Sequence, residues 1–227
     1  MRSTEIRRGA CAETPICLLH IGKTGGSFLR SILKTVESLP ANLHILKHSD
    51  TLESTRRRFG DDRQLAFVVR EPKSRFVSAF NSRMRQGRPT YSSQWSAAEA
   101  AAFQWFEDAN SLAEALGADD DRMRSAAYFA MDNIQHLKLN YQHFLTSVAE
   151  LKREKRNIRC CVDLTELDAK LSDVLTAMGV KGLPLDKHAK RHETPAAPIV
   201  LSEIAERNLR EYWAHEFEIY EYCRETL

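Results

Sequence analysis

A short apolar segment that turns through glycines into a helical pattern restricts this chain more than any other feature. Residues 16–19 read Ile-Cys-Leu-Leu, an uninterrupted apolar run typical of a strand buried on both faces of a parallel sheet. Residues 22–26 read Gly-Lys-Thr-Gly-Gly, and apolar residues then recur at helical spacing from Phe28 to Val36. In a strand, glycine turn and helix arranged this way, backbone N–H groups and the helix N-terminus face one point. The segment therefore predicts a site for a phosphate or a similar anion.

A P-loop for nucleoside triphosphates is the first interpretation to test. The Walker pattern requires glycine five positions before the Gly-Lys pair, and Cys17 occupies that position. The next buried run, residues 65–69, ends in Arg70-Glu71-Pro72 instead of an aspartate that could bind Mg²⁺. These departures disfavour a triphosphate loop, although a P-loop nucleotide kinase or phosphotransferase stays open as an alternative.

Two segments together resemble the PAPS-dependent sulfotransferases, in particular their bacterial and carbohydrate-type members, whose donor is 3′-phosphoadenosine 5′-phosphosulfate. Residues 20–27, His-Ile-Gly-Lys-Thr-Gly-Gly-Ser, are similar to the 5′-phosphosulfate loop of that family. Residues 67–80 are similar to its 3′-phosphate segment, with a strand, Arg70, an acidic residue, a proline and then Ser78. Strands that alternate with helices along the chain predict an α/β fold, a three-layer α/β/α arrangement around a mostly parallel central sheet. The P-loop-like sulfotransferase fold is of this kind.

The resemblance implies a set of residues that bind the donor. Lys23 would contact the 5′-phosphosulfate and stabilise the leaving phosphate, and the loop around it would supply N–H or hydroxyl donors. Arg70 and Ser78 would bind the 3′-phosphate, since arginine recognises phosphate with two parallel hydrogen bonds. A basic loop near the C-terminus would close over the nucleotide. The implied donor-binding residues are Gly22, Lys23, Thr24, Gly25, Gly26, Ser27, Phe28, Arg70, Ser78, Lys190 and Arg191. Arg75 is interpreted as a surface or salt-bridging residue.

Histidines supply the candidates for acid–base chemistry. His48 follows the second predicted strand, so we expect it at the same sheet edge as Lys23, where it would be the general base. His44 is the rival, although a place in the middle of a strand suggests burial. Gln135 and His136 belong to a polar cluster on a largely apolar helical segment. They either line the acceptor site or form an internal hydrogen-bond network, and the sequence does not decide between these roles.

Length and composition set the remaining expectations. The 227 residues are expected to form one domain, residues 1–227, with a flexible arm at 1–14 and an insertion or lid near the acceptor site at 87–121. A net charge of +2 does not suggest nucleic-acid binding, and no apolar run reaches the length of a membrane span. The five cysteines show neither zinc spacing nor a disulfide pattern, which favours a reducing, cytoplasmic location. No metal is expected, and the oligomeric state is open.

Several boundaries are also predicted. Strands are expected at residues 42–46, 64–69 and 157–162, and a helix is expected to start at Pro72. Residues 124–151 are expected to be one strongly helical segment, and the last helix is expected at 202–223. Ser49 or Asp50 would cap the helix that contains residues 56–58, and Thr165 and Asp168 would form a capping box.

The sequence therefore predicts a sulfotransferase that moves a sulfuryl group from PAPS to an acceptor hydroxyl, on a carbohydrate or a small molecule, and releases adenosine 3′,5′-bisphosphate (PAP). A non-catalytic module that binds PAP or PAPS is the alternative from a different functional class.

Overall fold

Four parallel strands form the centre of the molecule. The computed structural model describes residues 13–89, 91–181 and 200–227. The strand order is β2-β1-β3-β4, and every neighbouring pair is parallel. The strands are β1 (Ile16–Leu18), β2 (Leu43–Ile45), β3 (Gln64–Val69) and β4 (Ile158–Asp163). The predicted α/β class and three-layer arrangement are confirmed, and the predicted strands match to within one residue at each end.

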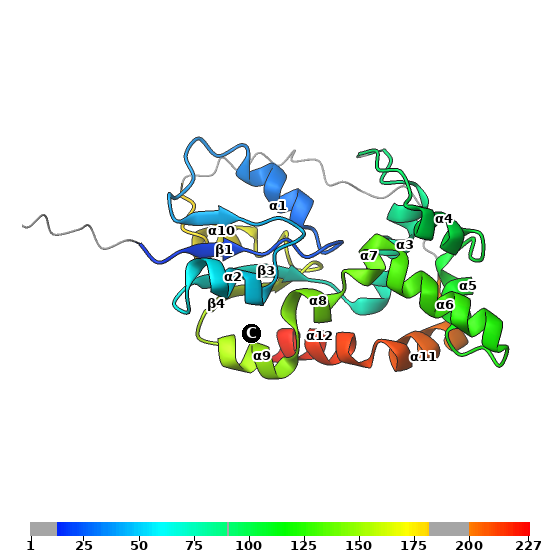
Figure 1. Ribbon diagram of the computed structural model, residues 1–227. Coiled ribbons are helices and arrows are strands. Elements are labelled where there is room, and N and C mark those ends of the chain that lie inside the picture. The colour runs from blue at the N-terminus through cyan, green and yellow to red at the C-terminus, as the bar shows by residue number, and fades with distance from the viewer. Residues whose placement is uncertain (1–12, 90, 182–199) are drawn as a thin grey trace, which may run out of the picture.

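Helices cover both faces of the sheet (Figure 1), and alternating residues of the strands supply a separate core on each face. Cys17, Leu65 and Phe67 pack on one side, and Leu18, Ala66 and Val68 pack on the other. The first side is covered by α2 (Leu52–Phe59), α8 (Tyr141–Leu145), α9 (Val148–Glu154) and α12 (Ala214–Thr226). The second side is covered by α1 (Gly26–Leu33) and α10 (Leu171–Ala177). Burial on both faces explains why β1 and residues 65–69 of β3 are apolar throughout.

A third core belongs to helices beside the sheet, at the right of Figure 1. Phe76, Phe80 and Phe106 are among its fully buried side chains. The helices are α3 (Pro72–Met84), α4 (Ala97–Phe103), α5 (Ala109–Ala115), α6 (Asp121–Asn133), α7 (Gln135–Lys138) and α11 (Glu203–Tyr212). Helices α4 and α5 fall within the predicted insertion at 87–121 and contribute to this core. A lid function for that segment stays a prediction.

The segment 124–151 is not one helix, as the sequence pattern had indicated, but contains the end of α6 and then α7, α8 and most of α9. Ile134 has an extended backbone (φ −69°, ψ 113°) that ends α6. The side chain of Asn140 accepts a hydrogen bond from the His143 N–H and starts α8, and Ser147 starts α9 in the same way. Side chains of this kind favour caps over helix interiors, so they divide an otherwise helical pattern.

Three other predicted boundaries are wrong for similar local reasons. The cap of α2 is Thr51, whose hydroxyl accepts from the Ser54 N–H; neither Ser49 nor Asp50 caps this helix. Thr165 forms no capping box with Asp168, because its hydroxyl and N–H both donate to the Asp163 carboxylate, and α10 starts only at Leu171. The predicted last helix is two helices, α11 and α12, which meet at Trp213.

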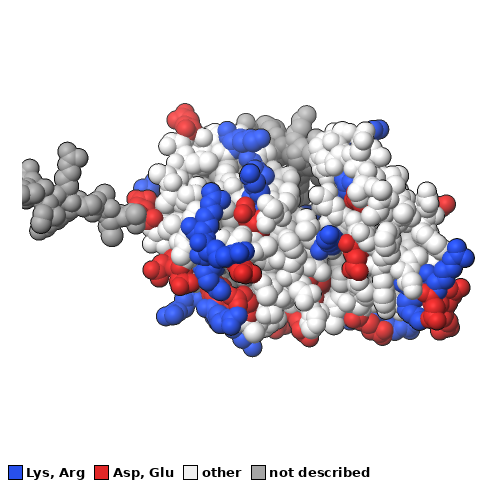
Figure 2. Space-filling model, viewed as in Figure 1, with Lys and Arg blue, Asp and Glu red and all other residues white. Residues whose placement is uncertain are grey.

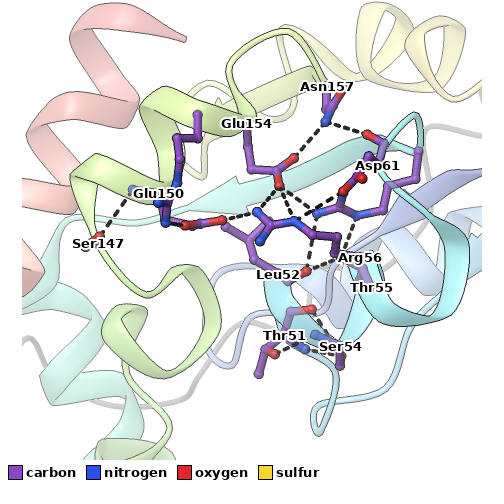
Figure 3. Close-up of polar contacts among 12 residues, drawn as sticks. Thr51, Leu52, Ser54, Thr55, Arg56, Asp61, Ser147, Glu150, Glu154 and Asn157 are labelled. Atoms are coloured by element: carbon purple, nitrogen blue, oxygen red, sulfur yellow. Dashed lines mark hydrogen bonds and ion pairs between the residues drawn. The ribbon is translucent and has the colours of Figure 1, made fainter.

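A network of arginine and glutamate side chains joins α2 to α9 (Figure 3). Arg56 pairs with both Glu150 and Glu154, and the fully buried Arg63 donates to Glu154 at 3.0 Å. Lys and Arg side chains gather over α2 on the molecular surface shown in Figure 2. Part of the basic run at residues 56–58 therefore connects two helices. No helix of the described residues is both long and apolar enough to cross a membrane.

Candidate anion-binding site

The loop between β1 and α1 has the backbone of an anion site. Lys23 (φ 67°) and Gly25 (φ 92°) adopt left-handed conformations that turn the chain sharply into the helix. A side chain at Gly25 would also meet Leu164, with 2.6 Å between its Cβ and the leucine Cδ1. None of the backbone N–H groups of residues 23–27 donates to another residue of the described chain. The loop therefore keeps a row of donors at the N-terminus of α1 for a ligand.

A cleft of about 910 Å³ opens beside this loop. It lies where the four parallel strands end, because it is lined by residues that follow each of them, including His20, His48, Arg70 and Leu164. This edge is the usual ligand site of an open parallel sheet. Among the described lining residues Asp168 is the one carboxylate, whereas the cations are Lys23, Arg30, Arg70, Arg85 and Arg88. Such an excess of positive charge favours an anionic ligand.

The structure brings most of the implied donor-binding residues together in this cleft. Lining residues from the prediction are Lys23, Gly25, Gly26, Ser27, Phe28, Arg70 and Ser78. Gly22 and Thr24 are not lining residues, because the Gly22 carbonyl accepts from Arg75 and the buried Thr24 hydroxyl donates to the Ile21 carbonyl at 3.0 Å. The Thr24 hydroxyl thus supports the loop from beneath. Lys190 and Arg191 lie outside the described residues.

Arg70 is held at the end of β3 by contacts on both its backbone and its side chain. Its N–H donates to the Tyr141 hydroxyl at 2.7 Å, and that hydroxyl donates to the Arg70 carbonyl at 2.6 Å. The guanidinium donates to the Ser74 hydroxyl at 3.0 Å and to the Lys23 carbonyl at 3.3 Å. The two segments of the resemblance, which are 47 residues apart in sequence at this bond, therefore touch directly. Ser74 belongs to residues 67–80, the segment similar to the 3′-phosphate segment, but the sequence did not predict that its hydroxyl would hold the Arg70 guanidinium.

Lys23 is desolvated in the cleft without a counter-charge from the described residues. Burial lowers the pKa of its ammonium to about 8, and the charges of Arg70 and Arg85 act in the same direction. A bound anion would reverse this effect, since an opposite charge nearby favours the protonated lysine. The loop is therefore arranged for a ligand that brings negative charge.

His48 has the tautomer that a general base needs. Its Nδ1 lies 3.0 Å from the His20 carbonyl oxygen, which can only accept, so Nδ1 carries the proton and Nε2 keeps a lone pair. Desolvation lowers the pKa of His48, opposed by this hydrogen bond and assisted by Arg30 and Lys23. The rival, His44, packs its ring 4.5 Å from that of Phe59 and is not a lining residue. Of the two candidates, His48 is the one that reaches the cleft.

Gln135 and His136 both line the cleft, and the backbone N–H of Gln135 also belongs to an internal hydrogen-bond network. The His136 ring lies 6.4 Å from that of His48. Burial lowers the pKa of His136 to about 3, with Lys23 acting in the same direction. The Gln135 N–H donates to the Glu99 carboxylate, which also accepts hydrogen bonds from Nε and Nη2 of the buried Arg83 at 2.7 and 2.8 Å. An internal network thus fixes the start of α7, and the side chains at that point face the cleft.

Arg75 is fully buried and faces the Glu216 carboxylate, so of its two predicted roles the salt-bridging one is confirmed and the surface one is wrong. Its guanidinium donates to the carbonyls of Gly22 (3.1 Å) and Leu139 and lies 3.8 Å from the carboxylate of Glu216. One side chain thus ties the anion loop to the α7–α8 junction and to α12. Helical spacing could have revealed this, because positions 75, 76, 79, 80 and 83 form the buried face of α3.

A scan against protein-family models, a search of curated proteins and a search of solved structures each found no match. The functional argument therefore depends on the residues of the cleft.

Proposed function

We propose that the protein is a PAPS-dependent sulfotransferase whose acceptor is a hydroxyl group of a carbohydrate or a small molecule. The observation that carries the proposal is the convergence of two segments on one cationic cleft. The loop with Lys23 would hold the 5′-phosphosulfate, and Arg70 with Ser78 would hold the 3′-phosphate. A ligand with anionic groups at both ends matches this distribution of donors.

The proposed reaction gives each of these groups a role. The acceptor oxygen attacks sulfur in line with the bond to the 5′-phosphate, so that an O–S bond forms while the S–O bond to the leaving phosphate breaks. His48 takes the acceptor proton on Nε2 as this bond forms. Lys23 and the free N–H groups of residues 23–27 stabilise the charge that grows on the departing PAP. Catalysis is then mainly positioning and electrostatic stabilisation, as in phosphoryl transfer.

The donor assignment is tested by thermal unfolding with PAP, with ATP and Mg²⁺, and without ligand. A ligand at roughly 100 times its Kd stabilises the folded state by about 2.7 kcal/mol. For a chain of this size that corresponds to a rise of about 5–11 °C in Tm. The rise with PAP should disappear in Arg70→Ala and persist in Arg156→Ala, an exposed arginine outside the cleft. A rise with ATP and Mg²⁺ but not with PAP would instead support a P-loop phosphotransferase.

Transfer itself is tested with sulfur-labelled PAPS and a panel of sugars and small alcohols. His48→Asn keeps a donor for the His20 carbonyl but removes Nε2. It should lower turnover by roughly 10²–10⁴-fold, the usual contribution of a general base, and leave PAP affinity nearly unchanged. Full turnover in this variant would refute the base assignment. PAP binding with no transfer to any acceptor of the panel would favour the non-catalytic module.

We include a reducing, cytoplasmic location in this proposal. The four cysteines of the described residues, Cys17, Cys160, Cys161 and Cys223, are free thiols, as is usual in reducing compartments. Thiol titration of the protein isolated under alkylating conditions tests this directly.

A further inference from the structure

His20, the first residue of the segment similar to the 5′-phosphosulfate loop but not one of the implied donor-binding residues, is held in one tautomer. It follows β1, is 5% exposed, and packs its ring 3.7 Å from that of His48. Its Nδ1 lies 3.2 Å from Nη1 of Arg30. Because a guanidinium can only donate, Nδ1 accepts and the ring proton is on Nε2. Burial lowers the pKa of His20 to about 3, assisted by His48 and Arg30, so the ring stays neutral near pH 7.

The Nε2–H of His20 lies against the start of α1. A Cβ built on Gly26, the first residue of that helix, would be 2.6 Å from His20 Nε2 and 2.2 Å from Cδ2. His20, Gly26 and Ser27 all line the cleft, and Nε2 has no hydrogen-bond partner among the described residues. A side-chain donor of fixed tautomer is thus placed beside the free N–H groups of residues 23–27.

We propose that His20 is a donor-binding residue whose Nε2–H hydrogen-bonds the anionic group at the 5′ end of the nucleotide. The proposal deepens the proposed function and rests on it for the identity of the nucleotide. Nε2 keeps its proton throughout the reaction, and its hydrogen bond strengthens as charge moves onto the leaving phosphate. A neutral donor suits this position, because Lys23, Arg30 and Arg70 already concentrate positive charge in the cleft. The proposal also explains Gly26, since any side chain there would displace the ring.

Three substitutions separate a hydrogen bond from a packing role. His20→Gln carries an amide N–H close to the position of Nε2, His20→Asn carries one only near Nδ1, and His20→Phe keeps the ring against His48 without any donor. Each variant is compared with the wild type in Kd for PAP, 5′-AMP and 3′-AMP by calorimetry, and in Tm without ligand. Arg70→Ala is the matched control, since the proposed function assigns it to the opposite end of the nucleotide.

The proposal predicts a ligand-specific pattern. His20→Asn and His20→Phe should each lower the affinity for 5′-AMP and for PAP by roughly ten- to a hundred-fold, the range for one hydrogen bond to a charged group. Their affinity for 3′-AMP should equal that of the wild type. His20→Gln should keep most of the wild-type affinity for 5′-AMP and PAP. Arg70→Ala should instead lower the affinity for PAP and 3′-AMP. Two outcomes would overturn the role of His20: equal nucleotide affinities in the Gln, Asn and Phe variants, or equal losses of affinity for 3′-AMP and 5′-AMP. In either case PAP binding by the wild type would still support the proposed function. If the wild type binds no nucleotide with a 5′ anion, both proposals fail.

Discussion

Removal of the buried Arg75 should be among the most damaging single substitutions in this chain. Arg75→Met keeps most of the apolar stem but removes the guanidinium that donates to Gly22 and Leu139 and faces Glu216. The carboxylate of Glu216 is 2% exposed and would lose its buried counter-charge. Breaking a buried ion pair by removing one partner costs about 3–5 kcal/mol. For a chain of this length the expected fall in Tm is about 6–20 °C.

The remaining carboxylate makes this prediction dependent on pH. Burial raises the pKa of Glu216, while Arg75 and the N–H groups of Tyr141 and Gln142 oppose the rise. Without Arg75 the pKa rises further, so the folded state binds more protons than the unfolded state above the usual carboxyl range. The free energy of unfolding then falls as pH rises through the folded pKa of Glu216. Arg75→Met should therefore be relatively more stable at pH 5 than at pH 8.

Urea unfolding at both pH values measures these effects. The double variant Arg75→Met/Glu216→Gln should recover at least about 1 kcal/mol and lose the added pH dependence, because no isolated charge remains. Arg153→Met is the control, since Arg153 is 72% exposed in its ion pair with Glu150 and should cost no more than about 1 kcal/mol. A loss in Arg75→Met as small as that of the control would refute the argument from burial.

Three other predictions concern the site. The lowered pKa of Lys23, about 8, means that PAP affinity should fall as pH rises above this value, and calorimetry on Lys23→Met should show a flatter profile as well as weaker binding. Gly26→Ala, whose Cβ would collide with the His20 ring, should weaken PAP binding at least as much as His20→Phe, whereas Gly22→Ala, whose Cβ would meet no atom closer than 4.0 Å, should bind PAP normally in the same assay. Glu99→Gln should lower Tm by several degrees. Burial by itself would raise the pKa of Glu99, but hydrogen bonds led by that of Arg83 outweigh it, so the contribution of this carboxylate to stability is present at neutral pH and is lost as pH falls through its lowered pKa.

Much of the fold was predictable because its signals are local. The segments 16–18 and 65–69 are apolar on both faces, and that pattern alone indicates a parallel sheet with helices on either side. The breaks in the segment 124–151 were not predicted, because Asn140 and Ser147 act through backbone conformation and a single cap bond. Hydrophobic spacing continues through such caps and does not reveal them.

The site was predictable to the extent that it follows from chain order. Lys23, His48 and Arg70 each come after a strand, and parallel strands bring such residues to one edge of the sheet. The roles of His20 and Arg75 depend instead on tertiary contacts, one with the next helix and one with a helix far along the chain. Arg30 fixes the tautomer of His20. Glu216, which lies 141 residues after Arg75 in the chain, faces the Arg75 guanidinium from α12. Contacts of that kind leave no spacing pattern in a single sequence.

Two groups of desolvated cations can be compared among the described residues. Arg63, Arg75 and Arg83 are buried, and each has a buried glutamate within 4 Å. Lys23 and Arg70 are also largely desolvated and form no ion pair with a carboxylate of the described residues; Glu71 and Asp163 act on the pKa of Arg70 from a distance, whereas the charges that act on Lys23 are the cations Arg70 and Arg85. Burial of a cation without a counter-charge destabilises the folded state, so such a group persists where a ligand supplies the missing charge. The first group holds helices of the fold together, and in the proposed function the second group binds the anionic donor.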